Sequence, residues 1–195
     1  LHHFEYDAGA SPRGDLLALN DKFYGLTEEG GEGYGFIFEY DPAADIYTPL
    51  HEFEYSTGVS PRHNLIPVNG KLYGMTHEGG DDGSGVIFEY DPTTDTYVVL
   101  HEFNYNTGNY PQGSLVFIND KFYGMTYEGG IEYGVIFEYD LNNDVYEVIH
   151  EFSYDEGSNP TGNLIVANNK FYGMTTQGGS QGAGIIFEYD PIAET

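Results

Sequence analysis

One segment, Lys71-Leu72-Tyr73-Gly74-Met75-Thr76, recurs along the chain and sets its architecture. Its tyrosine has counterparts at Tyr24, Tyr123 and Tyr172, so the spacings are 49, 50 and 49 residues. Two further motifs keep this spacing: a histidine after Leu or Ile (His2, His51, His101 and His150), and Phe-Glu-Tyr-Asp beginning at Phe38, Phe88, Phe137 and Phe187. The 195 residues therefore form four repeats, approximately 1–49, 50–99, 100–148 and 149–195, which predict a single domain over 1–195.

Each repeat has the pattern of four short strands. In the second repeat they are expected at residues 65–68, 71–76, 86–91 and 97–103. The first of these is continuously apolar, which is typical of a strand buried on both faces. It is joined to the second by Asn69-Gly70, a pair that tolerates the positive φ angles of a tight hairpin. A long loop, residues 104–112, is expected to lead to the next repeat.

Four antiparallel strands repeated every 40–50 residues are typical of a β-propeller blade. We therefore expect an all-β propeller of four blades, each of four antiparallel strands. The chain begins within a fourth strand and ends after a third, which predicts that residues 1–5 pair with residues 185–190 and that the two termini share one blade. The alternative is a four-blade segment of a larger ring.

The charge balance excludes one class of partner. Six Lys and Arg face 32 Asp and Glu, a net charge of −26, which argues against binding a nucleic acid. The sequence contains no stretch of about 18 apolar residues, so it predicts no membrane-spanning helix. The absence of cysteine excludes disulfides and thiolate metal sites. Any secretion signal is expected to lie outside this span.

The repeat resembles the bacterial GloVer tandem repeat, which is in turn similar to kelch repeats. The resemblance rests on Lys-Phe/Leu-Tyr-Gly-Met-Thr, Gly-Gly, Ile-Phe-Glu-Tyr-Asp-Pro and Leu-His-Glu-Phe, followed by a Gly and Pro loop, and covers essentially the whole chain. It implies a kelch-like propeller in secreted or cell-surface bacterial proteins, and no known catalytic activity. The chain departs from the family at one position of each repeat, where the family usually has a basic residue and this sequence has a glutamate: Glu39, Glu89, Glu138 and Glu188.

Three sets of residues resemble metal or catalytic sites. The four histidines occupy the same place on outermost strands, far apart around a rim, so we expect them to pack rather than to share a metal. The pairs Asp41/Asp45, Asp91/Asp95 and Asp140/Asp144 flank turns, where side-chain caps are the expected role. The acidic Gly-Gly loops lack an Asp-x-Asp-x-Asp-Gly pattern, so no cofactor is expected, although a single calcium ion is left open.

The candidate ligand-binding residues lie on loops. The Gly-Gly loops and the loops after each fourth strand connect strands at one end of the sheets and should share one face, where binding usually occurs. Two arginines there can bind a carboxylate ligand or form local ion pairs, and four tyrosines can stack on a ligand or pack between blades. These candidates are Arg13, Tyr34, Arg62, Tyr110, Tyr127 and Tyr133.

The sequence favours a non-enzymatic binding or display module, extracellular or on a bacterial surface, with a glycan or protein as ligand. Its other partners would be further domains of the same surface protein. A purely structural spacer of a long adhesin is the second hypothesis, and a carbohydrate-active propeller enzyme (a hydrolase or lyase) is the third. A monomer and a dimer that exchanges residues 1–5 are both compatible with the repeat phase.

Overall fold

The computed structural model describes residues 2–193. The chain forms two compact units, Leu1–Glu102 and Phe103–Thr195, and each is described by itself. Both are built from antiparallel sheets, as predicted, and the only helical elements in the described residues are the 3-10 turns η1 (Tyr6–Ala8), η2 (Tyr55–Thr57) and η3 (Tyr154–Glu156). Each unit contains two repeats and therefore two blades.

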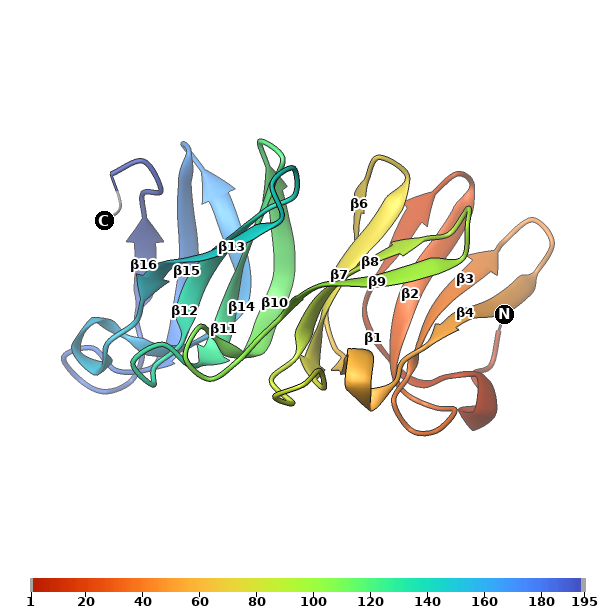
Figure 1. Ribbon diagram of the computed structural model, residues 1–195, viewed down its shortest axis with the longest axis horizontal. Coiled ribbons are helices and arrows are strands. Elements are labelled where there is room, and N and C mark those ends of the chain that lie inside the picture. Colours follow the sequence, from red (N-terminus) through yellow and green to blue (C-terminus); the bar gives the residue numbers. More distant parts are fainter. Residues whose placement is uncertain (1, 194–195) are drawn as a thin grey trace. The chain divides into compact units, whose positions relative to one another are not determined.

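The first unit contains two complete blades (Figure 1). One sheet has the order β1-β2-β3-β4, and the other has the order β5-β7-β8-β9 with β6 also paired to β7. Here β5 and β6 are two halves of one innermost strand. The strand bounds are β1 Ala10–Leu19, β2 Lys22–Glu29, β3 Phe36–Asp41, β4 Ile46–Glu52, β5 Val59–Pro61, β6 Ile66–Val68, β7 Lys71–Glu78, β8 Val86–Asp91 and β9 Thr96–Glu102.

The second unit contains one complete blade and one that lacks its outermost strand. This confirms that the last repeat lacks its fourth strand, whereas residues 2–5, predicted to lie in a fourth strand, form no strand. The predicted pairing of residues 1–5 with 185–190 involves Leu1, which lies outside the described residues, and stays a prediction. The strand bounds are β10 Asn109–Ile118, β11 Lys121–Glu128, β12 Val135–Asp140, β13 Val145–Glu151, β14 Ser158–Ala167, β15 Lys170–Gln177 and β16 Ile186–Tyr189.

The innermost strands correct two predictions. Three of them are ten residues long and include residues 10–13, 109–112 and 158–161, which were predicted as loop. They continue because Gly14, Gly113 and Gly162 adopt φ angles of 70°, 74° and 73° at an irregularity in the strand register. In the second repeat His63 replaces this glycine, and the strand is interrupted there.

The segment 65–68 was predicted to be buried on both faces, and this is wrong. Leu65 and Val68 are buried, but Pro67 is exposed and Ile66 is half-buried. The segment is an edge strand of its sheet, where the lack of a proline N–H removes no ladder hydrogen bond.

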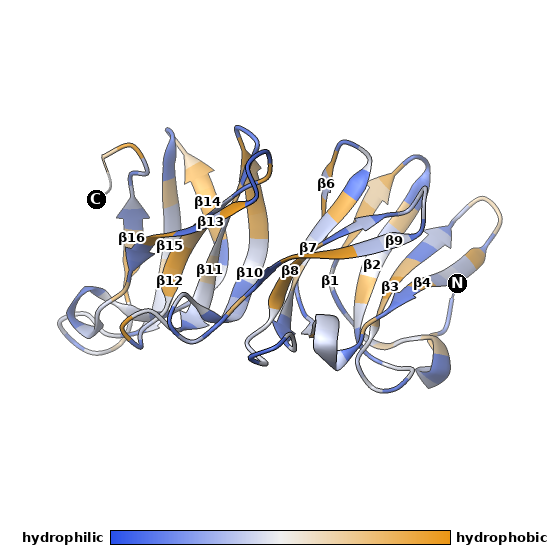
Figure 2. Cartoon of the chain, in the orientation of Figure 1, coloured by the Kyte–Doolittle hydropathy of each residue, from blue (hydrophilic) through white to orange (hydrophobic). Residues whose placement is uncertain are grey.

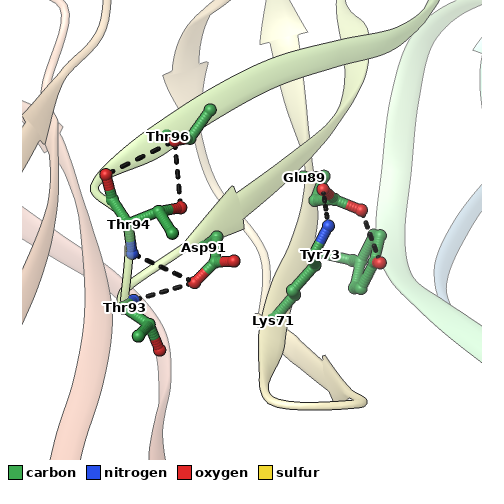
Figure 3. Close-up of polar contacts among 7 residues, drawn as sticks. All are labelled: Lys71, Tyr73, Glu89, Asp91, Thr93, Thr94 and Thr96. Atoms are coloured by element: carbon green, nitrogen blue, oxygen red, sulfur yellow. Dashed lines mark hydrogen bonds and ion pairs between the residues drawn. The ribbon is translucent and has the colours of Figure 1, made fainter.

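The predicted turn chemistry is confirmed. Asn69 and Gly70 have φ angles of 52° and 82°, as a type I′ hairpin requires. The counterparts Asn20-Asp21, Asn119-Asp120 and Asn168-Asn169 are also in this region. In the second turn of each blade an aspartate caps the backbone: Asp91 Oδ1 accepts from the N–H groups of Thr93 (2.8 Å) and Thr94 (3.3 Å), as Figure 3 shows.

The glycine of the Tyr-Gly-Met segment is required by packing. The Phe88 ring lies directly over Gly74, and a Cβ atom there would stand 2.6 Å from the phenyl Cζ. The same contact recurs at Gly25, Gly124 and Gly173, at 2.5, 2.4 and 2.5 Å. Hydrophobic and hydrophilic segments alternate along the strands (Figure 2). Each pair of blades thus buries a continuous apolar core.

Each unit has one apolar sheet surface that its own second blade does not cover. In the sheet of β14–β16, Met174 is 54% and Ile186 is 79% exposed, whereas Met125 and Ile136 at the same places in the preceding blade are 1% and 0% exposed. The face of β1–β4 that turns away from β5–β9 carries a hollow of about 350 Å³, lined by Leu16, Phe38 and Tyr47 among others. Both are the surfaces that a neighbouring blade covers elsewhere.

Candidate functional site: the loop face

The Gly-Gly loops and the 3-10 turns meet on one face of each unit, as the strand connections predict. Gly80 N–H donates to the Tyr55 carbonyl at 2.8 Å, and Gly179 N–H donates to the Tyr154 carbonyl at 2.9 Å. Backbone hydrogen bonds therefore fix the loops and the tyrosines of these turns relative to each other. We call this surface the loop face.

The acidic residues that end the outermost strands hold the Gly-Gly loops. The Glu52 carboxylate accepts from the Glu32 N–H, and Glu102 accepts from the Asp81 N–H, both at 2.7 Å. Gly31 is needed beside Glu52, because a Cβ atom there would lie 1.9 Å from Oε1. Within residues 2–193 no three His, Asp or Glu side chains are grouped so that they could hold a metal ion.

A groove opens on the loop face of the first unit, between its two blades. Its volume is about 770 Å³. We call it the acidic groove, because four carboxylates line it together with two tyrosines. The lining residues are Glu32, Tyr34, Glu52, Phe53, Glu54, Tyr55, Ser56, Gly80 and Asp81.

The candidate tyrosines have different positions. Tyr34 and Tyr133 are half-buried and pack against the cores of their units, and Tyr34 also lines the groove. Tyr110 is half-buried in β10 with a φ angle of 55°. Tyr127 is half-buried in β11, where its carbonyl accepts a hydrogen bond of 3.0 Å from Asn159 Nδ2.

Sequence reasoning missed Tyr55, although it lines the groove. Its repeated counterparts Tyr6, Tyr105 and Tyr154 were the available signal. Tyr55 and Tyr154 are exposed in the structure. The 3-10 turn directs the ring outward while the adjacent Phe53 is buried.

The two arginines form local ion pairs, which is the second of the two predicted roles. Arg13 Nε and Arg62 Nε donate to the two oxygens of Glu28 at 2.7 and 2.6 Å. Partial burial acts to raise the pKa of Glu28, but the hydrogen bonds from Arg13 and Arg62 outweigh it and lower the pKa. Their Nε atoms are therefore already engaged by a protein carboxylate.

The four lysines are held in a repeated triad with Glu and Tyr. In the second blade Glu89 accepts from Lys71 Nζ at 2.5 Å and from the Tyr73 hydroxyl at 2.6 Å (Figure 3). The glutamates of these triads are those that replace the basic residue of the family. The others are Lys22-Glu39-Tyr24, Lys121-Glu138-Tyr123 and Lys170-Glu188-Tyr172. All six basic side chains are thus ion-paired, and the charge of −26 is left without free lysine or arginine.

The strand histidines pack on tyrosine rings. His2 stacks on Tyr47 and His51 stacks on Tyr97, each with ring centroids 4.0 Å apart. Burial lowers the pKa of His51 and raises the pKa of Tyr47 to about 12. His51 therefore acts as a neutral packing group, as the packing interpretation predicts.

Similar solved structures support the fold. A chain of the nidogen/laminin complex is 12% identical, with a TM-score of 0.60, and the match covers 90% of this chain and 57% of that one. TolB from Acinetobacter baumannii is 15% identical, with a TM-score of 0.58 and coverage of 88% and 39%. The extracellular domain of BT4673 from B. thetaiotaomicron is 17% identical, with a TM-score of 0.62 and coverage of 93% and 21%. The matched part is under two thirds of each of these chains.

Nidogen and TolB are β-propeller-type proteins, and the four sheets of this chain are blades of that fold. A search of curated proteins gave no significant match. No helix in the described residues is long and apolar enough to cross a membrane. The model of the Gloeobacter/Verrucomicrobia repeat matches residues 1–187, a span that includes all four repeats. The chain belongs to the Gloeobacter/Verrucomicrobia repeat family.

Proposed function

We propose that this chain is a non-enzymatic binding module of an extracellular or surface protein, and that it binds a glycan in the acidic groove. The observation that carries the proposal is the joint lining of this groove by exposed Tyr55, half-buried Tyr34 and four carboxylates. Tyrosine rings provide flat surfaces for the C–H faces of a sugar, and carboxylates accept hydrogen bonds from its hydroxyl groups.

The rigidity of the groove also favours binding. Its tyrosine carbonyls are fixed by neighbouring loops, since Tyr55 O accepts from Gly80 N–H at 2.8 Å and Tyr34 O accepts from Ser60 N–H at 3.4 Å. A preorganised surface loses less conformational entropy when a ligand binds. Sugar ligands with many hydroxyl groups would gain directional contacts from such fixed positions.

One feature supports a binding role without catalysis. Glu52, one of the groove carboxylates, is engaged by the Glu32 N–H, which makes it a loop anchor rather than a free acid or base. The extracellular assignment is an expectation from the resemblance to surface repeats, and it agrees with the extracellular domain of BT4673 among the similar structures. A purely structural spacer remains the competing hypothesis, favoured by the near-identity of the four repeats.

The test is calorimetric titration of the chain with four neutral tetrasaccharides: cellotetraose, xylotetraose, mannotetraose and N-acetylchitotetraose. We expect at least one of them to bind and Tyr55→Ala to weaken its binding at least tenfold. Tyr6→Ala is the matched control, because Tyr6 is an equally placed, exposed ring that does not line the groove.

Failure of all four sugars to bind at millimolar concentration would refute the glycan proposal and leave the spacer hypothesis. Chromatography of each sugar after prolonged incubation tests the absence of catalysis. Release of shorter products by the wild-type chain would show that the module is an enzyme.

A further inference from the structure

The loops of the loop face repeat every two blades rather than every blade. Tyr34 of the first blade corresponds to Tyr133 of the third, whereas the second and fourth blades have Ser84 and Ala183. The latter two form the same isolated parallel bridges, Gly79 with Ser84 and Gly178 with Ala183. The loop pattern therefore has a period of 99 residues, and each compact unit contains one copy of the two alternating Gly-Gly loops.

Each residue that lines the acidic groove has a counterpart in the second unit, 99 residues further along the chain. The aromatic part is retained, since Tyr34, Phe53 and Tyr55 correspond to Tyr133, Phe152 and Tyr154. Tyr133 packs on the core of the second unit, as Tyr34 does in the first. The same blade-to-blade packing thus presents the same pair of tyrosines in both units.

The backbone hydrogen bond and the glycine contact around the second pair are also retained, and its two rings contact each other. The Tyr133 and Tyr154 rings lie 6.2 Å apart at an interplanar angle of 58°. The Tyr133 carbonyl accepts from Asn159 N–H at 2.8 Å. The Tyr154 hydroxyl lies over Gly182, where an added Cβ atom would stand 3.1 Å from it, just as Tyr55 lies over Gly83 at 2.8 Å.

The charge is the property that changes. Three of the four carboxylates of the acidic groove are replaced: Glu32 by Ile131, Glu54 by Ser153 and Asp81 by Ser180. Only Glu52 keeps an acidic counterpart, Glu151, and that residue contacts the Gly-Gly loop at Gly130 as Glu52 does at Gly31. Ile131 is exposed and adds an apolar surface beside the tyrosines.

One strained residue sits at this place. Glu132 has a φ angle of 96°, where its counterpart Gly33 has 106°. A residue with a side chain is disfavoured at such an angle, and retained strain of this kind is concentrated at ligand sites. Glu132 is exposed and directly precedes Tyr133 in the loop.

We propose that Tyr133, Tyr154 and Ile131 form a second saccharide site with a weaker preference for positive charge than the acidic groove, so that one chain carries two sites of different charge preference. This rests on the proposed function, because the chemistry of the second site is inferred from that of the acidic groove. The acidic groove accepts a cationic amino sugar as well as a neutral one. The second site has two lining carboxylates, Glu151 and Asp155 (the counterpart of Ser56), where the acidic groove has four, and it therefore gains less from a positive charge on the ligand.

The test is NMR spectroscopy of the chain with its tyrosines labelled at the ring carbons. The signals of Tyr34 and Tyr55 report the acidic groove, and those of Tyr133 and Tyr154 report the second site. The probes are the four neutral tetrasaccharides named above and the cationic glucosamine tetramer. We expect a neutral tetrasaccharide to shift the signals of Tyr133 and Tyr154. The glucosamine tetramer should bind at Tyr34 and Tyr55 at least tenfold more tightly than at Tyr133 and Tyr154.

Two matched variants assign the sites. Tyr154→Ala should abolish the shifts at Tyr133 and reduce the calorimetric stoichiometry from two sugars to one, and Tyr55→Ala should do the reverse. Movement of Tyr34 and Tyr55 alone would overturn the second site and leave the proposed function intact. Immobility of all four rings with every probe would refute both. Equal affinity of the glucosamine tetramer at both pairs would refute the charge preference.

Discussion

The exposed face of the last sheet makes a quantitative prediction through Ile186. This residue and Ile136 occupy the same position in consecutive blades of the second unit, yet their exposed fractions are 79% and 0%. Truncation to alanine removes three carbon atoms, worth about 0.8 kcal/mol each when fully buried. For Ile136, the cavity left behind brings the expected loss to about 3.5 kcal/mol.

Ile186 buries only about a fifth of its side chain, so its truncation should cost about 0.5 kcal/mol. The assay is urea unfolding of both variants beside the wild-type chain, followed by circular dichroism. With a slope of about 2.5 kcal/mol per molar urea, the midpoint should fall by about 1.4 M for Ile136→Ala and about 0.2 M for Ile186→Ala.

The pair shares one unit and one chemical change, so the loss of β propensity affects both variants and the difference between them reports burial. A loss above about 2 kcal/mol for Ile186→Ala would refute the reasoning. It would show that the face formed by β14, β15 and β16 is covered in solution.

Three further predictions concern the polar framework. Glu28→Gln should lower the free energy of unfolding by less than about 2 kcal/mol, because its partners Arg13 and Arg62 are exposed, and 1 M salt should reduce this loss. A larger loss that does not depend on salt would contradict the assignment of these contacts as surface ion pairs. Burial lowers the pKa of His51, so the unfolded chain binds a proton at this residue more readily than the folded chain, and the free energy of unfolding should fall as the pH drops below about 6.5. His51→Leu should reduce that fall when urea unfolding is measured at several pH values, and an unchanged profile would exclude His51 as a cause. Gly31→Ala should lower the free energy of unfolding by at least about 1 kcal/mol, because of the φ angle of 60° and the contact with Glu52. Thermal unfolding of the double variant with Glu52→Ala should show part of this loss recovered, and full additivity of the two losses would argue against the contact.

Local sequence chemistry predicted the blades well. The period of the Tyr-Gly segment defined the four repeats, and pairs such as Asn69-Gly70 placed the hairpins, because few residues tolerate two successive positive φ angles. The caps of Asp91 and its counterparts followed from the same reasoning. These features depend on a few neighbouring residues and are therefore readable from the chain alone.

Features that depend on distant residues were less accessible. The break in the innermost strand of the second repeat follows from a single replacement, His63 for glycine, whose effect depends on an irregularity in pairing with β7. The ion pairs of Glu28 join Arg13 and Arg62 from different blades. Tyr55 is 21 residues from Tyr34, and only the fold brings both to one groove.

The four lysine triads have a consequence for the reactivity of the protein. Each blade contains one lysine, at Lys22, Lys71, Lys121 or Lys170, and in each a hydrogen bond from the lysine to its glutamate raises the pKa of the amine. Amine acylation needs the neutral, uncomplexed amine, so a folded blade protects its lysine and an opened blade releases it. The chain thus carries four built-in chemical reporters, one per blade. Mass spectrometry of their acylation would give the opening of each blade separately from one experiment.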